Sequence, residues 1–145
     1  MKNYFNTAMA VMFLVAVLSI GARAQTSSPK IVATIPFSFS VGKTILPAGR
    51  YTITVVNPSS DRRTLQIRSL NGRSTAMIQT NDVIGQASDD AKLVFHRYGD
   101  RYFFAQAKLA GDSTALAAIK SSAEKTQQQL VAKAVRKSVV VIAAE

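Results

Sequence analysis

Residues 35–56, IPFSFSVGKTILPAGRYTITVV, contain two runs in which apolar and polar side chains alternate strictly. In residues 35–41 isoleucine, phenylalanine and valine lie on one side and serine on the other, and in residues 51–55 tyrosine, isoleucine and valine lie opposite threonine. This period of two is typical of strands with one face buried against a core. Gly-Lys at 42–43 and Pro-Ala-Gly at 47–49 supply turn residues between the runs. The stretch therefore predicts antiparallel β structure.

A first hairpin follows in residues 64–80, where Asn71-Gly72 lies between two alternating segments. Asn-Gly is the strongest short hairpin signal and predicts a two-residue type I′ turn. Counting outward from this turn places Ile67 opposite Ala76. The apolar residues of both strands then fall on one face, so the turn and the hydrophobic pattern predict the same register.

A second hairpin is predicted in residues 92–109, with Gly99-Asp100 as a type II′ turn because glycine comes first. Counting outward places aromatic residues on both faces: Phe95 opposite Phe104, and His96 opposite Phe103. Since both faces carry apolar side chains, we expect this hairpin to be central in the sheet or covered on its outer side.

The remaining pattern completes a single domain over residues 30–145. A first strand at 30–41 contains Pro36, which favours an edge or a bulge because proline cannot donate to the ladder. Residues 81–91 are predicted as a loop, and SVVVIA at 138–143 is predicted as a buried last strand. Between them, an amphipathic helix is expected at about 114–135. Its apolar stripe contains Leu116, Ile119, Ala123, Leu130 and Ala134. The predicted fold is mostly β, an antiparallel β-sandwich or barrel-like sheet of about seven or eight strands with one C-terminal amphipathic helix before a final strand.

The first 24 residues have the order of a secretory signal peptide: Lys2, an apolar run of 13 residues at 8–20, and Ala-Arg-Ala at 22–24. Such a run is short for the ~30 Å hydrocarbon layer, although an uncleaved anchor is the alternative. Cleavage is predicted between Ala24 and Gln25, followed by a flexible leader at 25–29. We therefore expect a secreted or periplasmic protein with no stable membrane anchor after cleavage. The sequence contains no cysteine, which excludes disulfides and thiolate ligands.

The chain is basic, with 18 Lys and Arg against 8 Asp and Glu, a net charge of +10. Cleavage of the signal peptide would remove two of these cations, Lys2 and Arg23, and leave a net charge of +8. Such an excess favours anionic partners. In an exported protein these are envelope polymers or glycans rather than nucleic acid, and ordinary solvated surface charge is the simpler alternative. The sequence indicates no oligomeric state.

Two resemblances are carried by these motifs. LPAGRYTI at 46–53 resembles the turn and strand of transthyretin-like and collagen-adhesin B-type sandwich domains. IPFSFSVGKTILPAGRYTI together with LVFHRYGDRYFFA at 93–105 is similar to a family of small secreted proteins of acidobacteria that is uncharacterised as to function. These resemblances imply export and a β-sandwich, and they bring no activity to this chain.

No catalytic, cofactor-binding or metal-binding set is predicted. His96 is the only histidine, and nothing in the sequence places a nucleophile and an orienting acid beside it. A small secreted hydrolase using His96 is the alternative function. A Ca²⁺ site at Asp89 and Asp90, with Asn81 and Asp82 nearby, is a weaker possibility, because adjacent acidic residues in a loop are usually just solvated.

Arginine and tyrosine gather at the end of the second hairpin, and these residue types are enriched on recognition surfaces. The candidate partner-binding residues there are His96, Arg97, Tyr98, Arg101 and Tyr102. A solvent-facing hairpin tip is the alternative. The sequence thus predicts a non-enzymatic, exported binding or structural module of the cell envelope or extracellular space, with a basic surface.

Overall fold

The computed structural model describes residues 29–132 and 138–144. The predicted signal peptide, most of the predicted leader and the expected end of the helix at about 135 lie outside these residues. The elements in chain order are β1 (Lys30–Ile35), β2 (Phe39–Val41), β3 (Thr44–Leu46), β4 (Gly49–Val55), β5 (Thr64–Ser69), β6 (Thr75–Ile84), β7 (Lys92–Tyr98), β8 (Arg101–Lys108), β9 (Thr114–Ala118), α2 (Ser122–Ala132) and β10 (Ser138–Ala143).

The predicted mostly β fold is confirmed as one open, mixed sheet of ten strands with a single described helix before the last strand. Eight strands follow one another in the order β1-β4-β5-β6-β9-β8-β7-β10, and every pair along this path is antiparallel. The short hairpin β2–β3 joins β8 through the parallel pair β2–β8. The count exceeds the expected seven or eight because the chain breaks into two strands around Pro36, and because β9 was predicted as helix.

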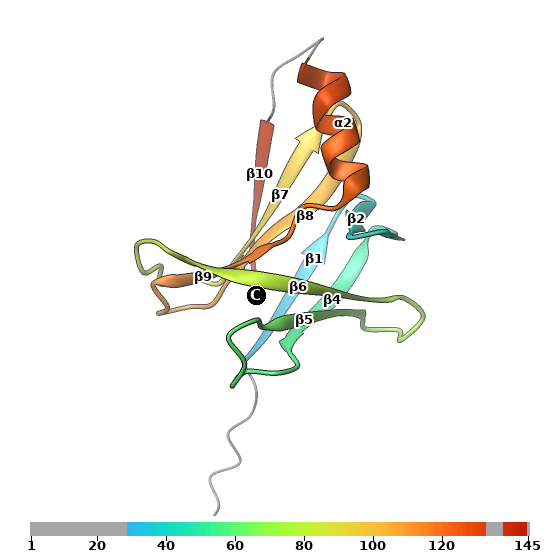
Figure 1. The fold of residues 1–145 in the computed structure, drawn as a ribbon. Coiled ribbons are helices and arrows are strands. Elements are labelled where there is room, and N and C mark those ends of the chain that lie inside the picture. Colours follow the sequence, from blue (N-terminus) through green and yellow to red (C-terminus); the bar gives the residue numbers. More distant parts are fainter. Residues whose placement is uncertain (1–28, 133–137, 145) are drawn as a thin grey trace, which may run out of the picture.

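β6 is the strand that turns the sheet around the core. Its first half pairs with β5 at residues 75–79, and its second half pairs with β9 at residues 80–84. In Figure 1, β6 runs along β5 and then continues beneath β7, β8 and β9. A strand shared in this way lets two parts of a sheet face each other across one core. The predicted loop at 81–91 is therefore wrong for residues 81–84, where pairing with β9 continues the strand.

The core fills the space between these two parts. It combines residues of the alternating runs, with Phe39, Tyr51, Ile53, Ile67 and Phe95 each at most 2% exposed. The edge position expected from Pro36 is confirmed, because β1 ends at the preceding residue and is an end strand of the sheet. Of the inward residues of the two alternating runs, all are buried except Phe37, which lies between β1 and β2 and is partly buried against the core.

The first hairpin has the predicted register with a different turn. Ile67 pairs with Ala76, as expected. Gly72 has φ of 72°, but Asn71 has no positive φ, so the turn is not type I′. Instead, Ser69 N donates to Ser74 O at 2.8 Å around a four-residue loop. A two-residue loop and this four-residue loop are centred on the same bond, so the register is the same for both.

The second hairpin agrees with its prediction in the turn and in the register from Tyr98–Arg101 to Phe95–Phe104, and a β-bulge between Val94 and Phe95 shifts the pairing by one residue beyond that point. Gly99 has φ of 61° and Asp100 has no positive φ, as a type II′ turn requires. The pairs are Phe95–Phe104 and His96–Phe103. The hairpin is also central, since β7 pairs with β10 and β8 pairs with β9 and β2. Its outer side is covered by α2, which packs on β7 (Figure 1).

The helix prediction is wrong at its start. Residues 114–118 form β9, between β6 and β8, and α2 begins only at Ser122. Alanine and leucine favour helix locally, but an open pairing position between two strands outweighs this preference of a few tenths of a kcal/mol per residue. Ser121 caps the true start, because its Oγ accepts from Glu124 N at 3.1 Å.

The predicted apolar stripe and the predicted burial of the last strand are also wrong. Of the expected stripe, Leu116 lies in β9, Ala123 is exposed and Leu130 is 60% exposed, and Ala134 lies outside the described residues. The helix residue that is buried is Glu124. In β10, whose predicted bounds are confirmed, Val139 and Val141 are exposed on one face, whereas Val140 and Ile142 on the other face are partly buried against the core.

Candidate functional site

The residues predicted for partner binding divide between the two faces of the β7–β8 hairpin. Arg97 pairs with Tyr102 on one face, where the arginine lies 5.5 Å from the centre of the tyrosine ring and that ring stacks on Phe37. His96 and Tyr98 lie on the other face beneath α2, and Tyr98 is 1% exposed. Arg101 is exposed at the start of β8. The structure therefore brings them together as pairs, and Tyr98 is not accessible to a partner.

His96 and Tyr98 both point toward a buried carboxylate, that of Glu124. Glu124 Oε1 lies 2.8 Å from His96 Nδ1 and accepts from the Tyr98 hydroxyl at 3.3 Å. The Glu124 side chain is 5% exposed and that of His96 is 19% exposed. A buried charge requires paired hydrogen-bond partners, and both are supplied by β7. The cluster of His96, Tyr98 and Glu124 thus joins α2 to β7 through polar contacts.

The cluster holds Tyr98 in its neutral form. Burial, followed by the charge of Glu124 and the hydrogen bond to it, raises the pKa of Tyr98 from 10.0 to about 12. Since the folded pKa lies above the unfolded one, the neutral phenol contributes stability that is fully present below pH 10 and is lost as the pH rises through about 12. In an alkaline titration followed by tyrosinate absorbance, we expect Tyr98→Phe to reduce the latest phase by one tyrosine.

Tyr102→Phe is the matched control for this titration, because Tyr102 has no contact with Glu124 among the described residues. It should leave the latest phase intact. Burial also raises the pKa of Tyr51, so a late phase is expected to persist in part after Tyr98→Phe. An unchanged amplitude in Tyr98→Phe would contradict the assignment.

The same geometry bears on the hydrolase alternative. His96 has an orienting acid in Glu124, which the sequence did not reveal, so two members of a nucleophile–base–acid set, the base and the acid, are in contact. Among residues 29–132 and 138–144, no serine or threonine hydroxyl is hydrogen-bonded to His96. The described part also contains no group of three or more His, Asp or Glu placed to hold a metal ion.

A polar, accessible surface is formed by the outer side of the sheet portion β1-β4-β5 with the first half of β6. Alternate residues of these strands face the core, so the intervening ones face outward. We call this surface the polar face, and its residues are Lys30, Val32, Thr34, Arg50, Thr52, Thr54, Thr64, Gln66, Arg68, Thr75, Met77 and Gln79. It carries three cations and no acidic residue.

The centre of the polar face is hollowed. A shallow depression of about 310 Å³ is lined by Lys30, Thr52, Thr54, Gln66, Arg68, Ser69 and Leu70. The register explains this arrangement: Lys30, Thr54 and Gln66 are opposite one another in one row across β1, β4 and β5. Thr52 and Arg68 are paired in the next row. Two rows of neighbouring side chains thus place hydroxyl and amide groups between two cations.

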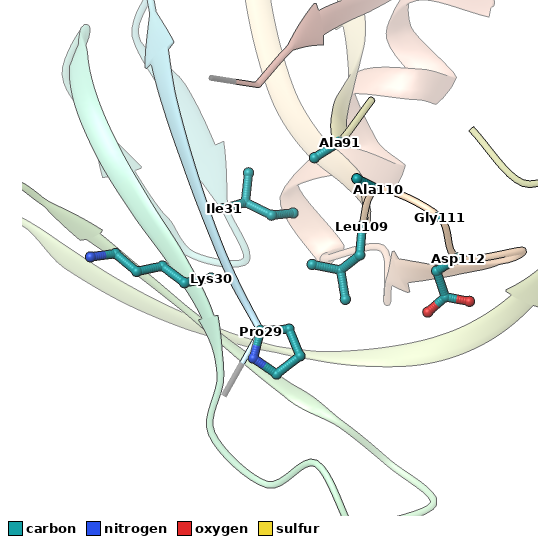
Figure 2. A pocket seen from close by; sticks show the side chains of 8 residues that line it. All are labelled: Pro29, Lys30, Ile31, Ala91, Leu109, Ala110, Gly111 and Asp112. Atoms are coloured by element: carbon teal, nitrogen blue, oxygen red, sulfur yellow. The ribbon is translucent and has the colours of Figure 1, made fainter. Parts of the chain in front are cut away.

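A larger depression of about 620 Å³ lies at one end of the sheet, where β1 begins. It is lined by Pro29, Lys30, Ile31, Ala91, Leu109, Ala110, Gly111 and Asp112. In Figure 2 the Ile31 and Leu109 side chains point into this space, whereas the Lys30 side chain points away from it. The ammonium group of Lys30 is therefore on the side of the polar face.

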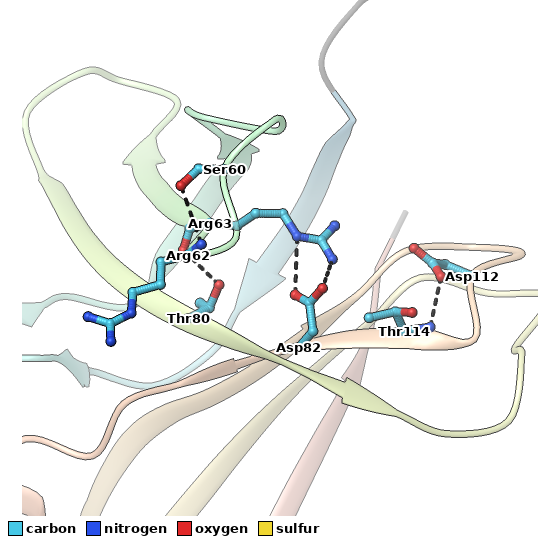
Figure 3. A network of polar contacts seen from close by, with 7 residues as sticks. All are labelled: Ser60, Arg62, Arg63, Thr80, Asp82, Asp112 and Thr114. Atoms are coloured by element: carbon cyan, nitrogen blue, oxygen red, sulfur yellow. Dashed lines mark hydrogen bonds and ion pairs between the residues drawn. The ribbon is translucent and has the colours of Figure 1, made fainter.

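Two acidic residues, Asp82 and Asp112, make their contacts outside the polar face. Asp82, in the second half of β6, forms an ion pair with Arg63, whose Nε donates to Asp82 Oδ1 at 3.1 Å (Figure 3). Asp112 accepts from Thr114 N at 2.7 Å in the loop before β9. Lys30 and Arg68 form no ion pair with any residue that the structure describes. Their charges are available to an anionic ligand.

Sequence reasoning missed the polar face, although two signals were present. The alternation predicts that Thr52 and Thr54 face solvent, and both lie on the outward side of β4. Asp61 is the only acidic residue before Asp82, so the segment that builds β1, β4 and β5 is almost free of negative charge. The Ser121-x-x-Glu124 spacing, typical of a helix N-terminus, could likewise have marked the start of α2.

Comparisons with protein-family models, with curated proteins and with solved structures gave no match for this chain. The resemblance to the acidobacterial proteins therefore stays a prediction. No helix in the described part is long and apolar enough to cross a membrane.

Proposed function

We propose that this protein is an exported, non-enzymatic binding or structural module of the cell envelope or extracellular space, and that the polar face binds an anionic polymer. The observation that carries the proposal is a hollowed sheet surface without acidic residues, on which Lys30 and Arg68 form no ion pair with the described part of the chain. Carboxylates are present elsewhere in the domain, so the local field on this face is positive.

The polar face supports this role better than the predicted hairpin tip does. Of the tip residues, Tyr98 is buried, His96 is held by Glu124 and Arg97 Nε donates to Gly99 O at 2.8 Å. In contrast, the polar face presents neighbouring paired strands with polar side chains at every outward position but Val32 and Met77. An extended polymer can contact several rows of such a surface at once.

The direct test compares two double variants that remove the same charge from different places. Lys30→Gln/Arg68→Gln should weaken binding to an acidic polysaccharide about tenfold, because exposed ion pairs contribute about 0.2–1 kcal/mol each. Arg97→Gln/Arg101→Gln, at the hairpin tip, should change it less than twofold. Binding is measured by co-sedimentation with purified peptidoglycan, lipopolysaccharide and a polyuronate.

A salt series accompanies the measurement. Affinity should fall as ionic strength rises, since the Debye length shortens to about 8 Å at physiological salt. Equal losses in the two double variants would show a response to net charge alone and contradict the assignment of the face. Failure of all three polymers to bind at low salt would remove the anionic partner.

A further inference from the structure

We infer that the polymer recognised by the polar face is an acidic polysaccharide in which carboxylate-bearing sugars are separated by neutral ones. This inference rests on the proposed function and names its ligand class. It starts from the separation of the two cations. Lys30 lies on β1 and Arg68 on β5, two strands away and one row of outward residues further along. Strand spacings place their Cα atoms about 10 Å apart across the sheet and about 7 Å along it, hence roughly 12 Å apart.

Single cations so far apart suit singly charged groups. A phosphate is usually bound by several donors at once, from clustered cations, a helix N-terminus or successive backbone N–H groups. The depression provides none of these: its two cations are about 12 Å apart, strands rather than a helix build it, and strand N–H groups lie in the plane of the sheet instead of facing outward. A carboxylate, in contrast, is matched by one guanidinium fork such as that of Arg68.

The groups between the cations favour sugar. Thr52, Thr54 and Gln66 line the depression between Lys30 and Arg68. Threonine hydroxyls and the glutamine amide both donate and accept hydrogen bonds, as sugar hydroxyls do, whereas phosphodiester oxygens only accept. A neutral, hydroxyl-rich unit therefore fits the middle of the depression, and a continuous row of anions does not.

Nucleic acid is the less suitable ligand. Proteins that bind single strands stack bases on aromatic side chains, and none of the polar-face residues is aromatic. The described aromatic side chains lie in the core or at the β7–β8 hairpin. The ligand is thus expected to cross β4 diagonally, with one carboxylate at Lys30 and the next at Arg68.

The experiment measures calorimetric affinities for four probes of matched length: an alternating uronate–N-acetylhexosamine oligosaccharide, a polyuronate, a neutral oligosaccharide and inorganic polyphosphate. We expect the alternating oligosaccharide to bind about tenfold more tightly than polyphosphate. The Thr52→Val/Thr54→Val variant keeps the β-branched shape and removes two hydroxyls. It should weaken the oligosaccharide about tenfold and leave polyphosphate within twofold. Thr44→Val, an exposed threonine of β3 away from the polar face, is the matched control and should change neither.

The outcomes separate the two proposals. The ligand class would be wrong if polyphosphate or the polyuronate bound as tightly as the alternating oligosaccharide. It would also be wrong if Thr52→Val/Thr54→Val bound the alternating oligosaccharide with unchanged affinity. Neither result would contradict the proposal that the polar face binds anions. Two results would overturn the proposed function and the ligand class together. One is that Lys30→Gln/Arg68→Gln changes the affinity for none of the anionic probes. The other is that no anionic probe binds at all.

Discussion

Phe95→Ala is expected to lower the free energy of unfolding by about 3–5 kcal/mol, the range typical of deleting a buried phenylalanine ring. Phe95 is fully buried on β7 and is the centre of the aromatic core. Its ring centroid lies 5.3 Å from those of Phe37 and Phe39 and 5.8 Å from that of Phe104. These neighbours come from two other parts of the chain, residues 37–39 and β8, whose backbones are held by strand pairing, so they cannot all move inward to fill the cavity.

Urea unfolding of the purified protein measures this effect. Whole domains are stable by only about 5–15 kcal/mol, so Phe95→Leu, expected to cost about 1–2 kcal/mol, provides a milder variant if the alanine variant does not fold. Ile45→Ala is the control, since Ile45 is 75% exposed and its loss should change stability by less than about 0.5 kcal/mol. A loss below about 1 kcal/mol in Phe95→Ala would show that the aromatic core is packed differently.

His96→Ala is expected to destabilise the protein by about 2–3 kcal/mol at neutral pH. Among the described residues, it leaves the buried Glu124 carboxylate with the Tyr98 hydroxyl as its one remaining side-chain partner. An uncompensated buried charge accounts for most of the cost of breaking such a pair. Glu124→Ala removes that charge as well and should cost less, about 1–2 kcal/mol.

The double variant makes the comparison quantitative. Because the two side chains are in contact, His96→Ala/Glu124→Ala should be more stable than the sum of the single losses implies, by at least about 1 kcal/mol. Additive losses would mean that the contact contributes nothing. The same His96→Ala protein tests the hydrolase alternative, since a hydrolytic activity that depended on His96 would disappear with it.

The two hairpins show how far local sequence reaches. Gly99 and Asn71-Gly72 mark reversals, and alternation decides which side chains face inward, so register follows from counting. In the first hairpin the predicted type I′ turn is wrong, but the predicted register is correct. A slip by one residue would move every apolar side chain to the solvent side, so the hydrophobic pattern keeps the register whatever the turn.

The helix shows where local sequence fails. Residues 114–118 have helical composition, and they are a strand because β6 and β8 leave a position that only a strand can fill. Glu124 looked like a solvated helix residue and is buried, because β7 presents His96 and Tyr98 beneath it. Both outcomes depend on neighbours distant in sequence.

The sequence by itself determined the β character, the strand faces and the turn positions, because side chains alternate along a strand whatever lies beside it. Only the tertiary structure decided which strands are neighbours. It placed Lys30 of β1 and Arg68 of β5 on one hollowed surface, 38 positions apart in the numbering, because both strands pair with β4. Alternation along one strand carries no information about its partner, so the polar face could be recognised only after folding.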